Sequence, residues 1–196
     1  KILWVKKHEP ELYAKCAHIL LPKDYIRYKL TGEYATEVSD ASGMQLLDVP
    51  NRKWSQVMID ALGIKEEYLA KVFESPEITG YINSDTSERT GLSTKTSVVG
   101  GAGDNAAAAV GMGVVEEGKA FTTIGTSGVV FAHTDKPIID PKGRVHTFCC
   151  AVPNAWPVMG VTQGAGLSMQ WFKNNFCSEE SAKAAEENTD VYRITD

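Results

Sequence analysis

The sequence lacks the patterns that mark membrane, secreted and nucleic-acid-binding proteins. No stretch approaches roughly 18 consecutive apolar residues, the minimum for a membrane-spanning helix, so no transmembrane segment is predicted. Residues 1–8 contain no apolar run followed by small residues, so no signal peptide is predicted. With 20 Lys and Arg against 25 Asp and Glu, the net charge is −5, which disfavours a nucleic-acid partner.

Paired cysteines and histidines, which typically form metal sites, are also lacking. The four cysteines form no CxxC pair, and the four histidines form no HxH or HxxxH pair. Cys149 and Cys150 are adjacent, and neighbours in a strand point to opposite faces, so they cannot easily share a metal ion. We therefore expect no metal ligands and four reduced core thiols, as in a cytoplasmic protein.

The composition is that of an ordinary folded protein. Hydrophobic residues make up 43% and charged residues 23% of the 196 residues, which argues against disorder. This length suggests one large domain or parts of two. Helical patterns predominate up to residue 117 and strand patterns follow, so we expect one domain region over 1–117 and a second over 118–196.

Apolar periodicity and turn residues predict the elements of the first region. Apolar residues recur at helical spacing over residues 8–20. A second helix over residues 24–31 is expected to end at Gly32. The remaining predictions are a loop over 36–43, a short strand over 44–47, helices over 55–62 and 66–73, and a strand over 78–82.

A strand, a glycine turn and a helix are predicted to follow one another around residue 100. Residues 97–99 are β-type, residues 100–103 are glycine-rich, and the alanine run after Asp104 favours a helix. Two strands, 120–124 and 129–132, flank Gly125–Gly128 as in a hairpin. Further strands are predicted over 146–151 and 156–162, with a helix starting near Gly166.

Asp104 has two interpretations that local sequence leaves open. At the start of a helix, its carboxylate would be kept ionised by the helix dipole and could accept a proton from a bound hydroxyl. Equally, it could simply cap the helix by accepting hydrogen bonds from backbone N–H groups.

The glycine turn also matches part of a dinucleotide-binding fingerprint. Gly101–Ala106 reads G-x-G-x-x-A after a strand, which would suit a nucleotide-dependent oxidoreductase. That fingerprint needs an acidic residue about 20 positions later, and residues 120–126 contain none. The following hairpin also disfavours this alternative.

Two further glycine motifs could bind anions. The turn Gly125–Gly128 carries two hydroxyl residues and could present donors to a phosphate, although most such turns only reverse a hairpin. Gly164–Gly166 precedes a predicted helix, whose N-terminus could bind an anion or simply allow close packing.

Several segments in one order resemble the FGGY family of carbohydrate kinases. They are KILW (1–4), LLPKDYIRYKLTGE (20–33), GGAGDNA (100–106), GTSG (125–128), VHTFC (145–149) and QW (170–171). The resemblance implies an α/β fold of actin-like, ribonuclease-H-like type, with parts of two domains around a cleft. It assigns residues 1–117 to the sugar-binding domain and 118–196 to the nucleotide-binding domain.

The resemblance implies roles for eight residues. The aspartate of the GDN motif is the general base in this family, so Asp104 would be catalytic and Asn105 would lie beside the sugar. The other implied contacts are Trp4 at the sugar pocket, Gly125, Thr126, Ser127 and Gly128 at the nucleotide phosphates, and Gly166 near the nucleotide.

The implied reaction is transfer of the γ-phosphate of ATP, with Mg²⁺, to a hydroxyl of a ketopentose, D-xylulose being the expected sugar. A homodimer is compatible with the family. The family's first phosphate loop and its adenine segment are missing from these residues, so we expect this chain alone to be inactive. A non-catalytic actin-like sugar-binding module remains an alternative.

Overall fold

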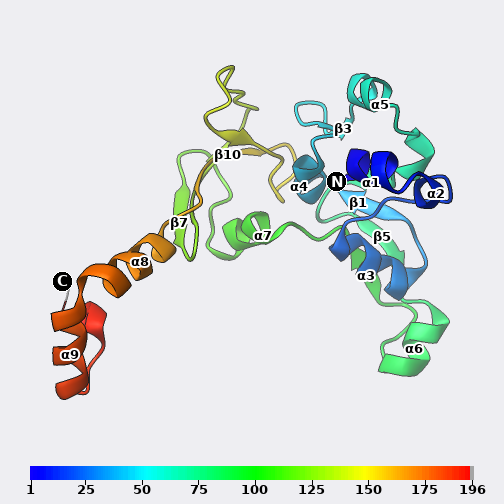
Figure 1. Ribbon diagram of the computed structural model, residues 1–196. Coiled ribbons are helices and arrows are strands. Elements are labelled where there is room, and N and C mark those ends of the chain that lie inside the picture. Colours follow the sequence, from blue (N-terminus) through cyan, green and yellow to red (C-terminus); the bar gives the residue numbers. More distant parts are fainter. Residues whose placement is uncertain (195–196) are drawn as a thin grey trace.

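The computed structural model describes residues 1–194 and combines helices with small sheets. Figure 1 shows short helices around the strands of the first region, and two C-terminal helices, α8 and α9, projecting away from the rest. No helix among residues 1–194 is long and apolar enough to cross a membrane.

The elements up to the glycine turn are short, and their strands form two-stranded pairs. β1 pairs with β4 in parallel, while β2–β3 and β5–β6 are antiparallel. The bounds are α1 (Ile2–His8), α2 (Pro10–Tyr13), α3 (Pro22–Thr31), β1 (Ala35–Glu37), α4 (Val38–Ala41), β2 (Leu47–Asp48), β3 (Lys53–Trp54), α5 (Gln56–Leu62), β4 (Lys71–Phe73), β5 (Ile78–Tyr81), α6 (Ser84–Thr90) and β6 (Ser97–Val99).

The predicted helix over residues 24–31 is confirmed as α3. Pro22 lies in the first turn of α3. Proline lacks a backbone N–H, and N–H groups in the first turn have no acceptor within the helix, so no hydrogen bond is lost there. The helix ends at Gly32, whose φ of 85° is a left-handed conformation that glycine adopts without strain. The helix predicted over 55–62 is likewise confirmed as α5, and the Ser55 hydroxyl accepts from the N–H of Met58 at its start.

Four predictions for the first region were wrong. The helix over 8–20 ends at Tyr13, because Ile19 instead forms a parallel bridge with Leu69 and its N–H donates to the Tyr68 carbonyl. The helix over 66–73 divides into a 3₁₀ turn and strand β4. The loop over 36–43 and strand over 44–47 are replaced by β1, α4, a 3₁₀ turn (Ser42–Met44) and β2, while α6 was not predicted.

The second region is built on one antiparallel sheet in the order β7-β8-β10-β9. The hairpin predicted around Gly125–Gly128 is confirmed, since Phe121 pairs with Phe131 and Ile124 with Gly128. The strand predicted over 146–151 is shorter, and α9 was not predicted. The first region ends with α7 (Asp104–Gly111), and the bounds in the second region are β7 (Ala120–Ile124), β8 (Gly128–Thr134), β9 (His146–Thr147), β10 (Trp156–Thr162), α8 (Gly166–Phe176) and α9 (Ser178–Glu186).

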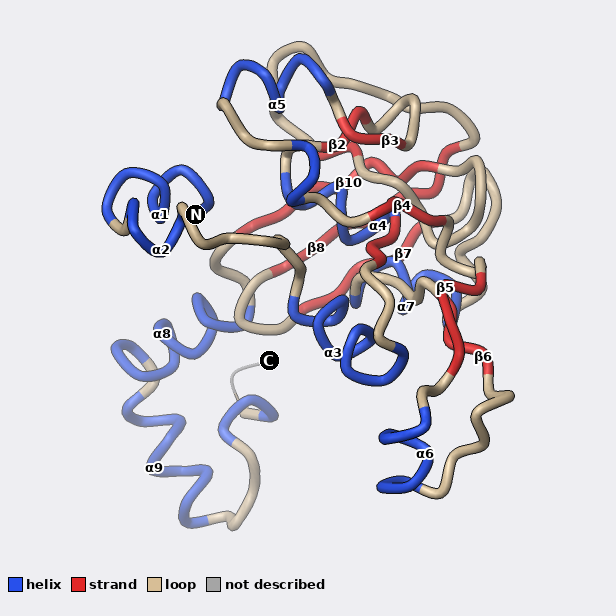
Figure 2. The backbone as a smooth tube through the Cα atoms, turned by 90° about the vertical axis from the view of Figure 1, so that its right-hand side faces the viewer, coloured by secondary structure: helices blue, strands red, loops and turns tan. Residues whose placement is uncertain are grey.

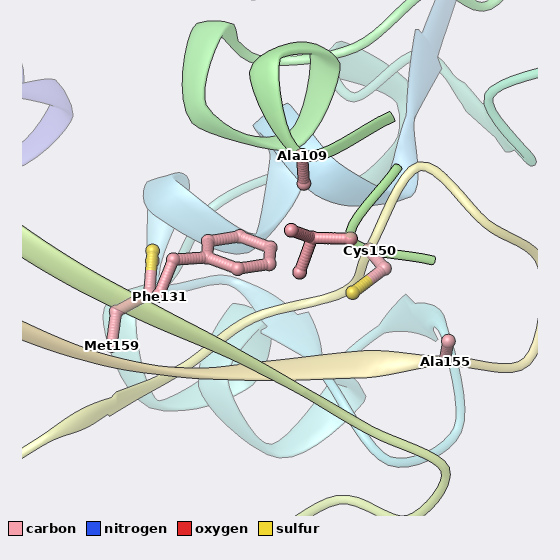
Figure 3. Close-up of a cluster of buried hydrophobic side chains, with 6 residues drawn as sticks. Ala109, Phe131, Cys150, Ala155 and Met159 are labelled. Carbon is pink, nitrogen blue, oxygen red and sulfur yellow. The ribbon is translucent and has the colours of Figure 1, made fainter. Parts of the chain in front are cut away.

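Helix α7 lies against this sheet through a core cluster. Figure 3 shows Ala109 of α7 pointing toward the strands that carry Phe131 and Met159. Phe131 is 1% exposed and also stacks on Phe121 of the neighbouring strand. Burial of these side chains holds the helix that begins with Asp104 on the face of the sheet.

The two predicted regions also share a core. In Figure 2, α4 lies beside β8 and β10. Val38 and Ala41 of α4 pack in one cluster with Cys149 and Trp156, which come from the second region. The Trp156 indole donates to the Val49 carbonyl at 3.0 Å, so apolar and polar contacts together join the regions.

Strand pairing argues against the dinucleotide-binding alternative. A Rossmann unit needs two parallel strands joined by its helix. Here β6 pairs with β5 in an antiparallel arrangement, and the strand that follows α7, β7, belongs to a different sheet. The G-x-G-x-x-A turn therefore does not lie in a βαβ unit.

Three of the four cysteines are buried and all four are free, in agreement with reduced core thiols. Cys16 differs from the prediction because it is only partly buried. Burial raises the pKa of Cys150 to about 12, which keeps this thiol protonated at neutral pH.

Gly100 is the tightest point of the glycine turn and yields a stability prediction. A Cβ there would lie 2.7 Å from the Glu74 carbonyl oxygen and 3.1 Å from the Glu37 Cβ. Gly100→Ala should therefore lower the free energy of unfolding by about 1–3 kcal/mol. Gly111→Ala is the matched control, since a Cβ there meets nothing within 4 Å. Urea denaturation of the intact protein checks both, and equal stability of the two variants would contradict the packing argument.

Candidate functional site

The glycine turn places Asp104 at the first position of α7, with its side chain exposed. The N-cap is Gly103, and no side chain caps this helix, so the interpretation of Asp104 as the N-cap was wrong. Its Oδ1 accepts from the N–H and the side-chain amide of Asn105, at 2.7 and 3.3 Å. Oδ2 has no hydrogen-bond partner among residues 1–194, so it is free to accept from a ligand.

A pocket of about 110 Å³ opens beside Asp104. Its polar lining comes from α4 and the start of α7, and its apolar lining comes from the sheet and the loop before β10. The polar lining contains Ser39, Asp40, Gly103, Asp104 and Asn105, and the apolar lining contains Phe131, Phe148, Cys149, Pro157 and Met159. Two carboxylates and an apolar surface in one pocket suit a small polyol, whose hydroxyls donate to the carboxylates while its C–H faces pack on the apolar lining.

The fold raises the pKa of the Asp40 carboxyl, which lines the pocket. Burial raises the pKa of its carboxyl, the ammonium of Lys23 opposes the rise, and the charges of Glu37 and Asp24 add to it. The Lys23 Nζ lies 3.7 Å from Asp40 Oδ2. Asp40 was not predicted as a site residue because the sequence around it suggests only a polar loop.

The turn Gly125–Gly128 packs against the start of α8 and forms a second candidate site. The N–H of Gly166 donates to the Gly125 carbonyl at 2.8 Å, and the N–H of Ala165 donates to the Thr126 carbonyl at 3.0 Å. Thr126 and Ser127 are exposed. Their hydroxyls make no hydrogen bond within the described chain. An anion at the helix N-terminus could accept from both.

Strands β8 and β10 carry both sites. Gly128 pairs with Thr162 at the turn, and Phe131 pairs with Met159 at the pocket. Gly128 and Phe131 lie three positions apart on β8, which corresponds to about 10 Å along the strand. The turn Gly125–Gly128 and the pocket of Asp104 therefore lie a short, fixed distance apart along one strand pair.

In the structure, seven of the eight residues predicted for the site fall into two groups. Asp104 and Asn105 line the pocket, while Gly125–Gly128 and Gly166 form the turn. Trp4 belongs to neither group, because it lies on α1, is 58% exposed and stacks on His8. Its contact with a sugar stays a prediction.

Metal ligands do not cluster in the described chain. No group of three or more His, Cys, Asp or Glu side chains within residues 1–194 could hold a metal ion. Mg²⁺ in phosphoryl-transfer sites is bound by one or two carboxylates together with substrate phosphates. Asp40 and Asp104 both line the pocket, and the structure assigns neither as a metal ligand.

Comparisons with known proteins agree with this geometry. Residues 1–111 match the model of the N-terminal domain of the FGGY family of carbohydrate kinases. A xylulose kinase of Escherichia coli K12 is 42% identical over 171 residues, covering 87% of this chain and 35% of that protein. A xylulose kinase of Bacillus subtilis 168 is 42% identical over 181 residues, covering 92% and 36%.

A solved structure is similar over the same part. The structure described as a xyloylose kinase from Brucella ovis has a TM-score of 0.85 and 39% identity, over 88% of this chain and 36% of that one. The chain therefore spans about a third of the length of the relatives it matches.

The raised pKa of Asp40 yields a pH-dependent stability prediction. Below the ordinary Asp pKa of about 3.9, the carboxyl is protonated in both folded and unfolded states and has no effect. As the pH rises above this value, the unfolded state ionises first, so ionisation opposes folding. Asp40→Asn should therefore gain stability relative to wild type as the pH rises from about 4 to 7.

Urea midpoints of the intact protein at the two pH values measure this gain. Asp60→Asn is the control, since Asp60 is exposed on α5 and should show no such gain. If Asp40→Asn is stabilised by the same amount at both pH values, the raised pKa of Asp40 is contradicted.

Proposed function

The chain belongs to the FGGY family of carbohydrate kinases, and we propose on this basis that it forms part of an ATP-dependent sugar kinase that phosphorylates a ketopentose, D-xylulose. Its fold is the actin-like α/β fold expected from the sequence, which the similarity to solved sugar kinases confirms. The observation that carries the proposal is that β8 and β10 bear both a phosphate-type turn and the pocket of Asp104.

In this proposal Asp104 is the general base. Its free Oδ2 accepts the proton of a sugar hydroxyl as the hydroxyl oxygen attacks the γ-phosphorus of ATP, and ADP leaves with the electrons of the broken P–O bond. Asn105 is fixed beside Asp104 by its two hydrogen bonds to the carboxylate and faces the sugar.

The nucleotide phosphates bind at Gly125–Gly128 in this proposal. The exposed hydroxyls of Thr126 and Ser127 supply donors. Mg²⁺, when bound with the nucleotide, neutralises phosphate charge. We assign it no ligand in this chain.

The sugar, the domain boundary and the location of the protein complete the proposal. The similarity to two xylulose kinases at 42% identity supports D-xylulose as the sugar. The end of the family match at residue 111 supports a domain boundary near residue 117. Free thiols are typical of the cytoplasm, which is where we place the protein.

Replacement of Asp104 tests the base. In the intact protein, Asp104→Asn should lower kcat for sugar-dependent ADP release with D-xylulose by about 10²-fold or more, since the proton acceptor is lost. Stability should change by at most about 1 kcal/mol, the usual size of a charge–dipole term at a helix start. Asp85→Asn in the first turn of α6 is the matched control and should leave kcat unchanged.

Two outcomes would count against this proposal. Retained turnover in Asp104→Asn would remove Asp104 as the base. Absence of ADP release by the wild type with every ketose and polyol tried would favour the non-catalytic module.

Replacement of Gly166 tests the nucleotide site. A Cβ at Gly166 would lie 2.5 Å from the Gly125 carbonyl oxygen, so Gly166→Ala must displace the turn. We expect the KM for ATP to rise about tenfold, the loss of roughly one hydrogen bond to a charged group, while the KM for the sugar changes little. Gly160→Ala on β10 is the control, since its Cβ meets nothing within 4 Å. An unchanged KM for ATP would place the phosphates elsewhere.

A further inference from the structure

A single hydroxyl links the glycine turn to helix α4. The Ser39 hydroxyl donates to Glu37 Oε1 at 3.0 Å and accepts from the N–H of Gly103 at 3.0 Å. Ser39 is 5% exposed, so solvent does not compete for either bond. Because a hydroxyl has one proton, donation to Glu37 leaves its lone pairs directed at Gly103.

Glu37 fixes the orientation of this hydroxyl. Its side chain is fully buried, and besides Ser39 Oγ it accepts from four groups. These are the N–H groups of Ser39 and Asp40 at 2.7 and 2.9 Å, Ser75 Oγ at 2.9 Å and Lys23 Nζ at 3.1 Å. With this many partners the carboxylate cannot rotate without breaking several bonds, so the Ser39 proton has one low-energy direction.

Gly103 is the residue at which this link affects the site. It is the N-cap of α7 and directly precedes Asp104. Earlier in the turn, Gly101 is held separately, by its N–H bond to the Ser75 carbonyl. Within the described chain, the Ser39 bond is the one hydrogen bond that ties residues 102–104 to an element outside the turn and α7.

We propose that Ser39 is a positioning residue for phosphoryl transfer: its hydroxyl, oriented by Glu37, holds the Gly103 amide and thereby sets the position of the Asp104 carboxylate. The inference rests on the proposed function for its catalytic consequence. The geometric link between Ser39 and Gly103 does not depend on that function. Ser39 does not act on the transferred proton itself.

Two substitutions separate positioning from general stability. Ser39→Ala and Ser75→Ala each remove one hydroxyl donor from Glu37, and both residues are buried. Only Ser39→Ala also removes the acceptor of the Gly103 N–H. Both variants should lose thermal stability, and only Ser39→Ala should also affect the position of Asp104.

The first measurement is amide hydrogen exchange over residues 100–106 of the intact protein. Ser39→Ala should speed exchange of the Gly103 amide by about tenfold or more, while Ser75→Ala leaves it close to wild type. Similar exchange rates in the two variants would overturn the proposal. If Ser39→Ala does not fold, Ser39→Cys, which keeps a weak donor and acceptor, should show the same difference at smaller amplitude.

The second measurement is steady-state kinetics with D-xylulose and ATP. Ser39→Ala should lower kcat roughly 10- to 100-fold through misplacement of the base, with the KM for ATP unchanged, and Ser75→Ala should keep kcat. Ser39→Thr, which retains the hydroxyl, should restore most of kcat. Equal kcat in the Ser39→Ala and Ser75→Ala variants would overturn the catalytic part of the proposal.

The two readouts also separate this inference from the proposed function. A wild type without sugar-dependent ADP release would refute the proposed function, and the Gly103 exchange rate would still decide whether Ser39 positions the turn. An active wild type with a normal Gly103 exchange rate in Ser39→Ala would refute this inference alone.

Discussion

The buried carboxylate of Glu37 is the group around which the first region is organised. A charged group without solvent contact is tolerated only when hydrogen bonds and an opposite charge replace the lost water. Glu37 obtains these from α3 through Lys23, from α4 through Ser39 and Asp40, and from the segment after β4 through Ser75. Satisfying one carboxylate therefore fixes the helix that follows it, a lysine 14 positions earlier and a serine 38 positions later.

Helix α3 extends this network to the glycine turn. Lys23 donates to the Gly100 carbonyl as well as to Glu37, and buried Arg27 donates to the carbonyls of Val99, Gly100 and Ala35. Asp24, itself 1% exposed, accepts from Arg27 at 2.9 Å and balances its charge. The end of β6 is thus held by two cations, of which Arg27 is buried and needs these carbonyls in place of water.

Local sequence signals were sufficient for the elements that local forces form. Gly32 ends α3 in a left-handed conformation, and the alanine run of α7 favours a helix wherever it is placed. The hairpin around Gly125–Gly128 follows from two β-type runs and the turn between them. Prediction failed where distant partners decided the outcome, as when Ile19 paired with Leu69 although its spacing favoured a helix.

The same division holds for the candidate site. The sequence by itself determined the glycine turn, the start of α7 at Asp104 and the turn Gly125–Gly128. Glycine conformation and helix propensity act over a few residues, so these features need no distant partner. Only the tertiary structure decided that Ser39 and Asp40 join Asp104 in one pocket and that Trp4 stays outside it. The bond from Gly103 to Ser39 spans 64 residues, and its formation depends on the burial of Glu37. No local pattern encodes such a bond, because its energy appears only when the surrounding chain has excluded water.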